Sequence, residues 1–161
     1  MQSKQWIAER TTHYFVQERY NCAQSVAMAA ADALGTDPMP FAKMLNGFGA
    51  GVAGSRNVCG ALTGAIAVLG AATSKGCGRT RDVEGYNVAN ALSAKLYAQF
   101  CDRFQTPLCC ELTGVKAGDG AAQAKFLAGG GHARVCEVCV REACEMALRL
   151  IDEHAQKTHN E

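Results

Sequence analysis

The segment VCGALTGAIAVLGAA, residues 58–72, is almost entirely apolar and has the spacing of a buried helix. Leu62, Ile66 and Leu69 stand at positions i, i+4 and i+7, which places them on one face of an α-helix. Gly60 and Gly64 interrupt this pattern near its start, where a packed helix gains nothing from them. The segment therefore predicts a buried helix whose N-terminal end is approached closely by another group.

Helical patterns continue along the rest of the chain, separated by glycine and proline. No segment alternates apolar and polar residues for long enough to form a strand. We predict an all-α fold, a bundle of four long helices plus short helical turns, in a single domain over residues 1–161. The expected helices cover residues 3–19, 21–34, 39–46, 58–72, 80–104 and 133–154, with one short turn near 109 followed by a glycine-rich connection.

Charge and hydropathy exclude several classes of partner. The 161 residues carry a formal net charge of +1, with acidic and basic residues interspersed, so we expect no nucleic acid partner. No stretch approaches the roughly 18 apolar residues that a membrane span requires, so we expect no membrane partner. The first residues lack the apolar core of a secretory signal. The sequence predicts a cytoplasmic protein.

Nine cysteines stand out against that background. Cytosolic thiols are kept reduced, so a cysteine-rich cytosolic chain is more often metal-binding or redox-active than cross-linked by disulfides. An odd number of cysteines also cannot pair completely within one chain. Composition alone therefore favours sulfur chemistry.

Two of these cysteines fall at the start of predicted helices. Asn21 and Gln24 form the pattern of a capping box, which places Cys22 at the first helical position. Asn57 is expected to cap the next buried helix, with Cys59 at its second position.

Two further cysteines repeat this placement. Thr106 is expected to cap a short helix with Pro107 at its first position and Cys109 at its third, and Cys136 lies within about the first turn of the last helix. Helix N-termini present unpaired N–H groups and the positive end of the dipole, which favours the thiolate. We therefore expect lowered pKa values for these four cysteines.

Four thiolates from four helices suit an anionic tetrathiolate centre. Such a set binds a [2Fe–2S] or [4Fe–4S] cluster, or structural zinc. Zinc sites normally use paired C-x₂₋₄-C knuckles, which single cysteines match less well. Gly60 and Gly64 would leave room for a cluster or for a neighbouring backbone.

Two other motifs are weaker. GAGVAG, residues 49–54, matches G-x-G-x-x-G, but a dinucleotide site needs a preceding strand and a later acidic residue, so we expect a loop over the cysteine site. CEVC, residues 136–139, has thioredoxin spacing without a βαβ pattern, although Cys139 could act as a resolving thiol. His132 could replace one thiolate as a ligand.

The chain resembles the C_GCAxxG_C_C family of redox-active proteins. The matching pieces are NCAQSV at 21–26, GFGAGVAGSRNVCGALTGA at 47–65, CCELTG at 109–114 and VCEVCVREA at 135–143. The resemblance implies that the family's four motif cysteines are Cys22, Cys59, Cys109 and Cys136. Cys110 is an alternative to Cys109, and Cys139 and Cys144 are alternatives to Cys136.

Three functions are compatible with this sequence. The first is a redox-active protein whose four cysteines bind an iron–sulfur cluster, serving as electron carrier, oxidoreductase or redox sensor beside an unidentified redox partner protein. The second is a metal-free thiol–disulfide protein that uses the same cysteines. The third is a structural zinc module. An alanine-rich bundle of this size is also compatible with a homodimer.

Overall fold

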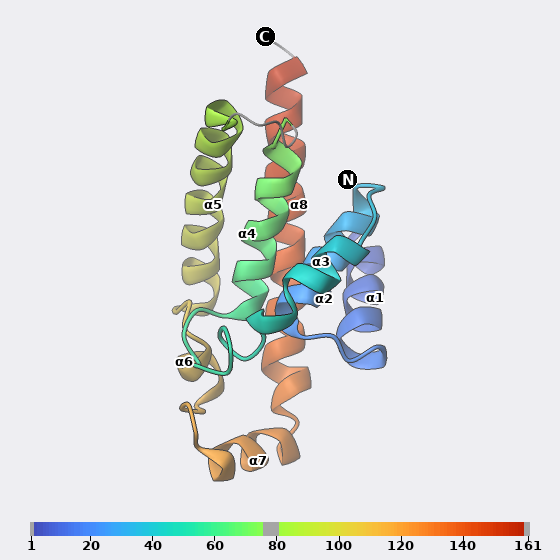
Figure 1. Ribbon diagram of the computed structural model, residues 1–161. Helices are drawn as coiled ribbons and strands as arrows, with labels where there is room; N and C mark the ends of the chain where they lie inside the picture. Colours follow the sequence, from blue (N-terminus) through green and yellow to red (C-terminus); the bar gives the residue numbers. More distant parts are fainter. Residues whose placement is uncertain (1, 76–80, 160–161) are drawn as a thin grey trace.

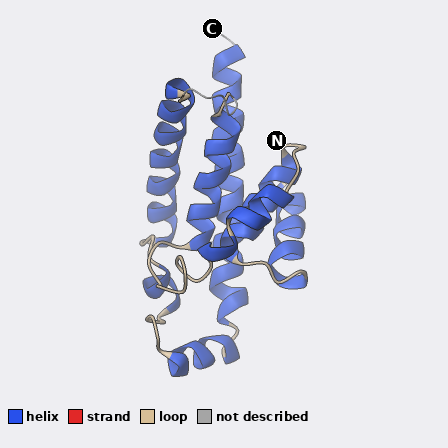
Figure 2. Cartoon of the chain, in the orientation of Figure 1, coloured by secondary structure: helices blue, strands red, loops and turns tan. Residues whose placement is uncertain are grey.

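The computed structural model describes residues 2–75 and 81–159, and the fold within them is all-α, as predicted. These residues form eight α-helices and no strand (Figure 2). The helices are α1 (Lys4–Thr12), α2 (Cys22–Ala33), α3 (Met39–Met44), α4 (Gly60–Thr73), α5 (Val83–Phe104), α6 (Cys109–Thr113), α7 (Gly120–Ala128) and α8 (Glu137–His159). Two π-helical segments, His13–Gln17 and His132–Cys136, and a 3₁₀ turn, Asn46–Phe48, complete the helical structure.

The buried segment identified first in the sequence becomes α4, which lies at the centre of the fold. It packs against α2, α5 and α8, and α8 also contacts α1 and α2. Figure 1 shows α4, α5 and α8 running side by side, with α7 beyond the ends of α4 and α5. The longest helices are α2, α4, α5 and α8, which agrees approximately with the predicted four, and the expected helix at 3–19 is divided into α1 and a π-helical segment.

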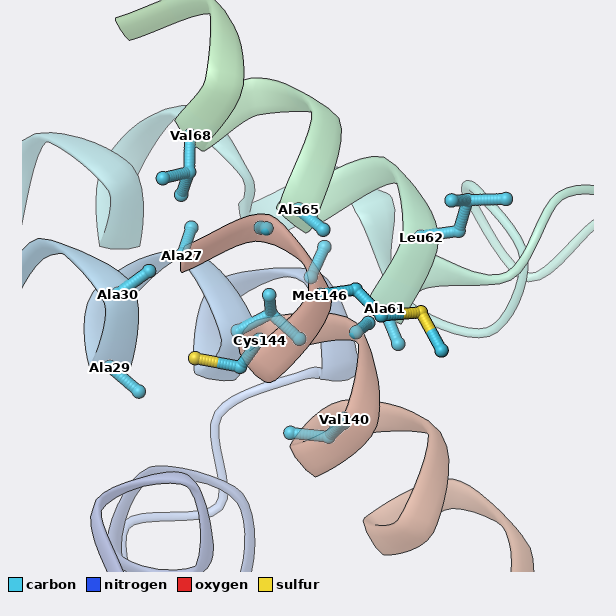
Figure 3. Close-up of a cluster of buried hydrophobic side chains, with 14 of the residues drawn as sticks. Ala27, Ala29, Ala30, Ala61, Leu62, Ala65, Val68, Val140, Cys144 and Met146 are labelled. Carbon is cyan, nitrogen blue, oxygen red and sulfur yellow. The ribbon is translucent and has the colours of Figure 1, made fainter. Parts of the chain in front are cut away.

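Small side chains allow the central helices to approach closely. Ala27 and Ala30 of α2 are fully buried, as are Ala61 and Ala65 of α4 (Figure 3). Cys144 of α8 is also fully buried in this cluster, where it packs like a small apolar residue.

Several helix boundaries differ from the sequence prediction. Residue 80, the expected start of one helix, lies outside the described residues, and α5 begins at Val83 with Asp82 as its cap. α8 continues to His159, five residues beyond the expected end. The largest difference is α7, which occupies part of the connection expected to be glycine-rich. Its start is fixed by Asp119, whose side chain accepts a hydrogen bond from the Ala122 amide.

No helix among the described residues is both long enough and apolar enough to cross a membrane.

Candidate functional site

One cavity collects the cysteines that the sequence singled out. It has a volume of about 580 Å³. Its walls include five cysteines from separate parts of the chain, Cys22, Cys59, Cys109, Cys136 and Cys139. All eight cysteines in the described part of the chain are free thiols, so these five sulfurs are chemically available.

Cys22 stands where the local sequence predicts it. Asn21 caps α2, its side chain accepting hydrogen bonds from the Ala23 and Gln24 amides, while the Gln24 side chain accepts one from the Asn21 amide. This complete capping box makes Cys22 the first residue of the helix.

Cys59 is offset from its predicted position. It is the capping residue of α4, which begins at Gly60, whereas the sequence suggested Asn57 as the cap and Cys59 inside the helix. The reason is a contact with a distant segment, because the Cys59 amide donates a 2.8 Å hydrogen bond to the Pro107 carbonyl. An extended backbone at residues 58 and 59 satisfies that contact and delays the helix.

The same contact brings Cys109 to the site. Val58 and Leu108 form an isolated antiparallel β-bridge, and the Cys109 amide donates to the Asn57 carbonyl at 2.7 Å. Cys109 is therefore the first residue of α6 with Leu108 as the cap, two positions earlier in the helix than expected.

Cys136 and Cys139 enter the cavity from the start of the last helical run. Cys136 ends the π-helical segment that leads into α8, so it is not in a free first turn. Cys139 is buried, and its thiol lies close enough to the Cys59 thiol to raise the pKa of Cys59. Both residues line the cavity, whereas the lining does not include Cys110, and Cys144 lies in the helical core.

The pKa values move in the opposite direction from the one expected. Burial, together with the neighbouring sulfurs, raises the pKa of Cys22 to about 12 and that of Cys136 to about 12. The neighbouring thiol of Cys139, followed by burial, raises the pKa of Cys59 well above its usual value. Burial likewise raises the pKa of Cys109.

The helix amides do act in the predicted direction, but they are outweighed. The amides of Ala61 and Leu62, in the first turn of α4, lower the pKa of Cys59 by less than burial and Cys139 raise it. Burial of four sulfurs close together disfavours their ionisation more than the helix amides favour it. The prediction of lowered pKa values is therefore wrong for the metal-free thiols.

Two glycines leave the space that the sequence pattern suggested. A Cβ atom on Gly60 would lie 2.5 Å from the Cys22 sulfur, and one on Gly64 would lie 2.3 Å from the Ala23 carbonyl oxygen. Gly60 thus makes room for a thiol and Gly64 for the α2 backbone, so the close approach of a neighbouring backbone is found at Gly64. The loop at residues 49–54 also borders the site, because Gly49 and Ala50 line the cavity.

The cavity, at about 580 Å³, is larger than a single metal ion requires. A single tetrahedral Zn²⁺ needs sulfurs at about 2.3 Å from one point. Within residues 2–75 and 81–159, no group of three or more His, Cys, Asp or Glu side chains has an arrangement that could hold a metal ion.

Further cavity residues could not be recognised from sequence patterns. Arg56 reaches to 3.9 Å from the Cys109 sulfur and donates a hydrogen bond to Gln123 of α7. His132 lines the cavity, and its ring contacts Phe15 and Phe126 at centroid distances of 5.6 and 6.1 Å. Because α7 was not predicted, its residues Gln123 and Phe126 could not be assigned to the site.

These features define an all-α protein with a thiol-lined cavity between helix termini. A family model described as "Putative redox-active protein (C_GCAxxG_C_C)" matches residues 20–150, and the chain belongs to this family. A protein of Archaeoglobus fulgidus, described as uncharacterized, is 34% identical over 110 residues, which cover 65% of this chain and 73% of the relative. No solved structure matches the chain.

Proposed function

We propose that the protein binds an iron–sulfur cluster through Cys22, Cys59, Cys109 and Cys136 and serves in electron transfer or redox sensing. The observation that carries this proposal is the convergence of these four motif cysteines on one cavity of about 580 Å³. When bound, a cluster accepts and donates single electrons, which accords with membership of a redox-active family.

The width of the cavity favours a cluster over zinc. The thiolates of a cluster bind different iron atoms and therefore stand farther apart than the ligands of one ion. The raised pKa values belong to the metal-free thiols, and a bound metal would supply the positive charge that lets these buried sulfurs ionise.

The expected setting follows from this chemistry. The reducing cytoplasm would keep the thiols available for cluster assembly. A partner protein would exchange electrons with the cluster, and this protein would serve as an electron carrier, an oxidoreductase or a redox sensor. The homodimer compatible with the sequence remains part of this proposal and is tested by measuring the mass in solution.

Anaerobic purification and reconstitution with iron and sulfide test the main point. We expect a coloured protein with visible charge-transfer absorption and stoichiometric iron and acid-labile sulfide. A colourless protein without iron after reconstitution, or one that holds stoichiometric zinc in its place, would contradict the proposal.

Single cysteine variants test the ligand set. Serine substitutions of Cys22, Cys59, Cys109 and Cys136 should each lower the bound iron and change the absorption spectrum. Cys110→Ser is the matched control, because its neighbour Cys109 lines the cavity and Cys110 does not. If Cys139→Ser loses the iron while Cys136→Ser retains it, the fourth ligand is Cys139.

A second function is favoured by one arrangement, the neighbouring thiols of Cys59 and Cys139 in the same cavity. In a thiol–disulfide reaction with a small-molecule disulfide, the two thiols would form a Cys59–Cys139 disulfide and the reagent would leave as two thiols. Alkylation and mass spectrometry after mild oxidation would detect this pair. A reversible Cys59–Cys139 disulfide in a protein that never binds iron would select this function.

A further inference from the structure

Arg56 is held at the cavity by its backbone. Its amide donates a 3.0 Å hydrogen bond to the Ala50 carbonyl, and its carbonyl accepts a 2.9 Å hydrogen bond from the Cys110 amide. The first contact closes the loop on itself, and the second ties the loop to α6. The amide and the carbonyl of Arg56 are therefore both held in place beside Cys109.

The loop adopts an unfavourable backbone to achieve this. Arg56 has a φ of +62°, in the left-handed region, and three other non-glycine residues of the same loop, Ala50, Val52 and Ala53, have φ values of 51°, 65° and 52°. Non-glycine residues in this region are strained and persist only where the surrounding contacts hold them. Gly51 makes the fold-back feasible, because a Cβ there would lie 2.7 Å from the Arg56 backbone.

The side chain of Arg56 crosses from one wall of the cavity to the other. One guanidinium nitrogen, Nη1, lies 3.9 Å from the Cys109 sulfur, and the other, Nη2, donates a hydrogen bond to the Gln123 side chain on α7. Gln123 thus directs the planar guanidinium, whose fixed fork of donors suits two partners at once. Arg19 and Glu137 also line the cavity, but within residues 2–75 and 81–159 neither side chain forms a hydrogen bond with a cysteine sulfur.

We propose that Arg56 is a positioning residue that supplies a fixed positive charge to the thiolates of this cavity, with Gln123 setting its orientation. The proposal deepens the proposed function and rests on it, since a cluster held by four thiolates is anionic. It also applies to the metal-free site, because any thiolate at Cys109 faces the same guanidinium. Arg56 is partly buried, and a partly buried cation interacts more strongly with a nearby anion than an exposed one does, since the surrounding protein screens it less than water does.

The first test compares two alkylating reagents on the reduced, metal-free protein. Iodoacetate is anionic and iodoacetamide is neutral, and the same thiolate attacks both. The ratio of their rates at Cys109, followed by peptide mass spectrometry, therefore reports the local charge and not the fraction of thiolate. We expect Arg56→Met to lower this ratio several-fold and Arg56→Lys, which retains the charge, to keep most of it.

Two further variants complete this test. Lys95→Met removes one positive charge from the exposed surface of α5 and should leave the ratio unchanged. Gln123→Leu leaves the arginine in place without its hydrogen-bond acceptor and should lower the ratio in part. An Arg56→Met ratio equal to that of the unmodified protein, or an Arg56→Lys ratio as low as that of Arg56→Met, would overturn the proposal.

The second test uses the reconstituted protein. Reduction adds negative charge, so removal of the nearby cation should make the midpoint potential more negative in Arg56→Met, with Arg56→Lys close to the unmodified protein. Equal potentials in all three would overturn the role of Arg56 at the loaded centre. The two proposals fail separately, because a protein that binds no iron still reports the charge at Cys109 through the alkylation ratio.

Discussion

At Gly64 a single hydrogen atom in place of a side chain allows α2 and α4 to touch. The nearest atoms that a Cβ would meet, at 2.3–2.9 Å, belong to the Ala23 backbone and cannot rotate away. Gly70 lies in the same helix, but a Cβ there would meet nothing within 4 Å. The two positions therefore share the helical backbone and differ only in their surroundings.

We expect Gly64→Ala to lower the free energy of unfolding by about 1–3 kcal/mol, because the helices must separate to accept the methyl group. Gly70→Ala should raise it by about 0.5–1 kcal/mol, since alanine loses less backbone entropy in a helix. Urea unfolding of both variants measures the two changes. Equal effects at the two positions would show that backbone propensity, and not helix contact, governs this part of α4.

The placement of the cysteines shows what a local sequence can and cannot determine. Cys22 was placed correctly because its cap, Asn21, and the capping partner Gln24 are within three residues. Cys59 and Cys109 were each displaced because the bridge between Val58 and Leu108 joins segments fifty residues apart. No pattern within either segment encodes that pairing. The raised pKa values were missed for the same reason, since they depend on burial beside distant sulfurs.

In the loop before α4, Ala53 has a left-handed backbone that glycine adopts without strain. Ala53 is exposed and has a φ of 52°, and its amide donates a 2.8 Å hydrogen bond to the Gly47 carbonyl. Relief of left-handed strain, about 1–2 kcal/mol, outweighs the extra flexibility of glycine, about 0.5–1 kcal/mol. Ala53→Gly should therefore leave the free energy of unfolding unchanged or raise it by up to about 1 kcal/mol.

Ala94→Gly is the matched control for this change. Ala94 is also exposed but lies within α5, where the same substitution should cost about 1 kcal/mol. Thermal unfolding of the two variants should therefore shift the midpoint in opposite directions, or shift only that of Ala94→Gly. A loss of stability at Ala53 equal to that at Ala94 would contradict the argument from strain.

The junction of α1 and α2 contains a buried polar group with a pH-dependent contribution. The Tyr14 hydroxyl, in the π-helical segment after α1, donates a 2.8 Å hydrogen bond to Asp32, which also pairs with Arg10. Burial and Asp32 raise the pKa of Tyr14 to about 12, from about 10 in an unfolded chain. Folding therefore favours the protonated phenol.

The sign of the pH dependence follows. The stabilisation from Tyr14 is complete below pH 10 and is lost as the pH rises through about 12. Between pH 10 and 12 the free energy of unfolding should fall by on the order of 1–2 kcal/mol more in the unmodified protein than in Tyr14→Phe. Tyr86→Phe, at a ring that is 50% exposed, should leave the slope unchanged. Parallel curves for the unmodified protein and Tyr14→Phe would contradict the assignment.

The helices themselves were largely predictable because each carries its own apolar pattern and end signals. The exception, α7, contains no residue that the structure buries fully, so it lacks the stripe on which the prediction relied. Its Asp119 cap was a usable signal that the surrounding glycines obscured. The π-helical start of the last helix was also unpredictable, because it depends on how the preceding segment packs.

At the scale of the whole molecule, the cysteine site ties together the start of α2, the start of α4, α6 and the entry to α8. The helices α2, α4 and α8 contact one another, and α6 contacts the π-helical entry to α8, so segments far apart in the sequence form the walls of the site. A group bound by all four cysteines would therefore link most of the bundle, so its binding free energy would add to the stability of the folded state.

We therefore expect reconstitution with iron and sulfide to raise the thermal midpoint well above that of the metal-free protein. A stabilisation of about 3 kcal/mol corresponds to roughly 6–12 °C for a domain of this size. Cys22→Ser and Cys136→Ser should abolish this increase while changing the metal-free midpoint much less. Cys101→Ser, on α5 and outside the cavity, should keep it. Anaerobic calorimetry of loaded and metal-free samples makes the comparison, and an equal increase in Cys22→Ser would mean that the iron is bound elsewhere.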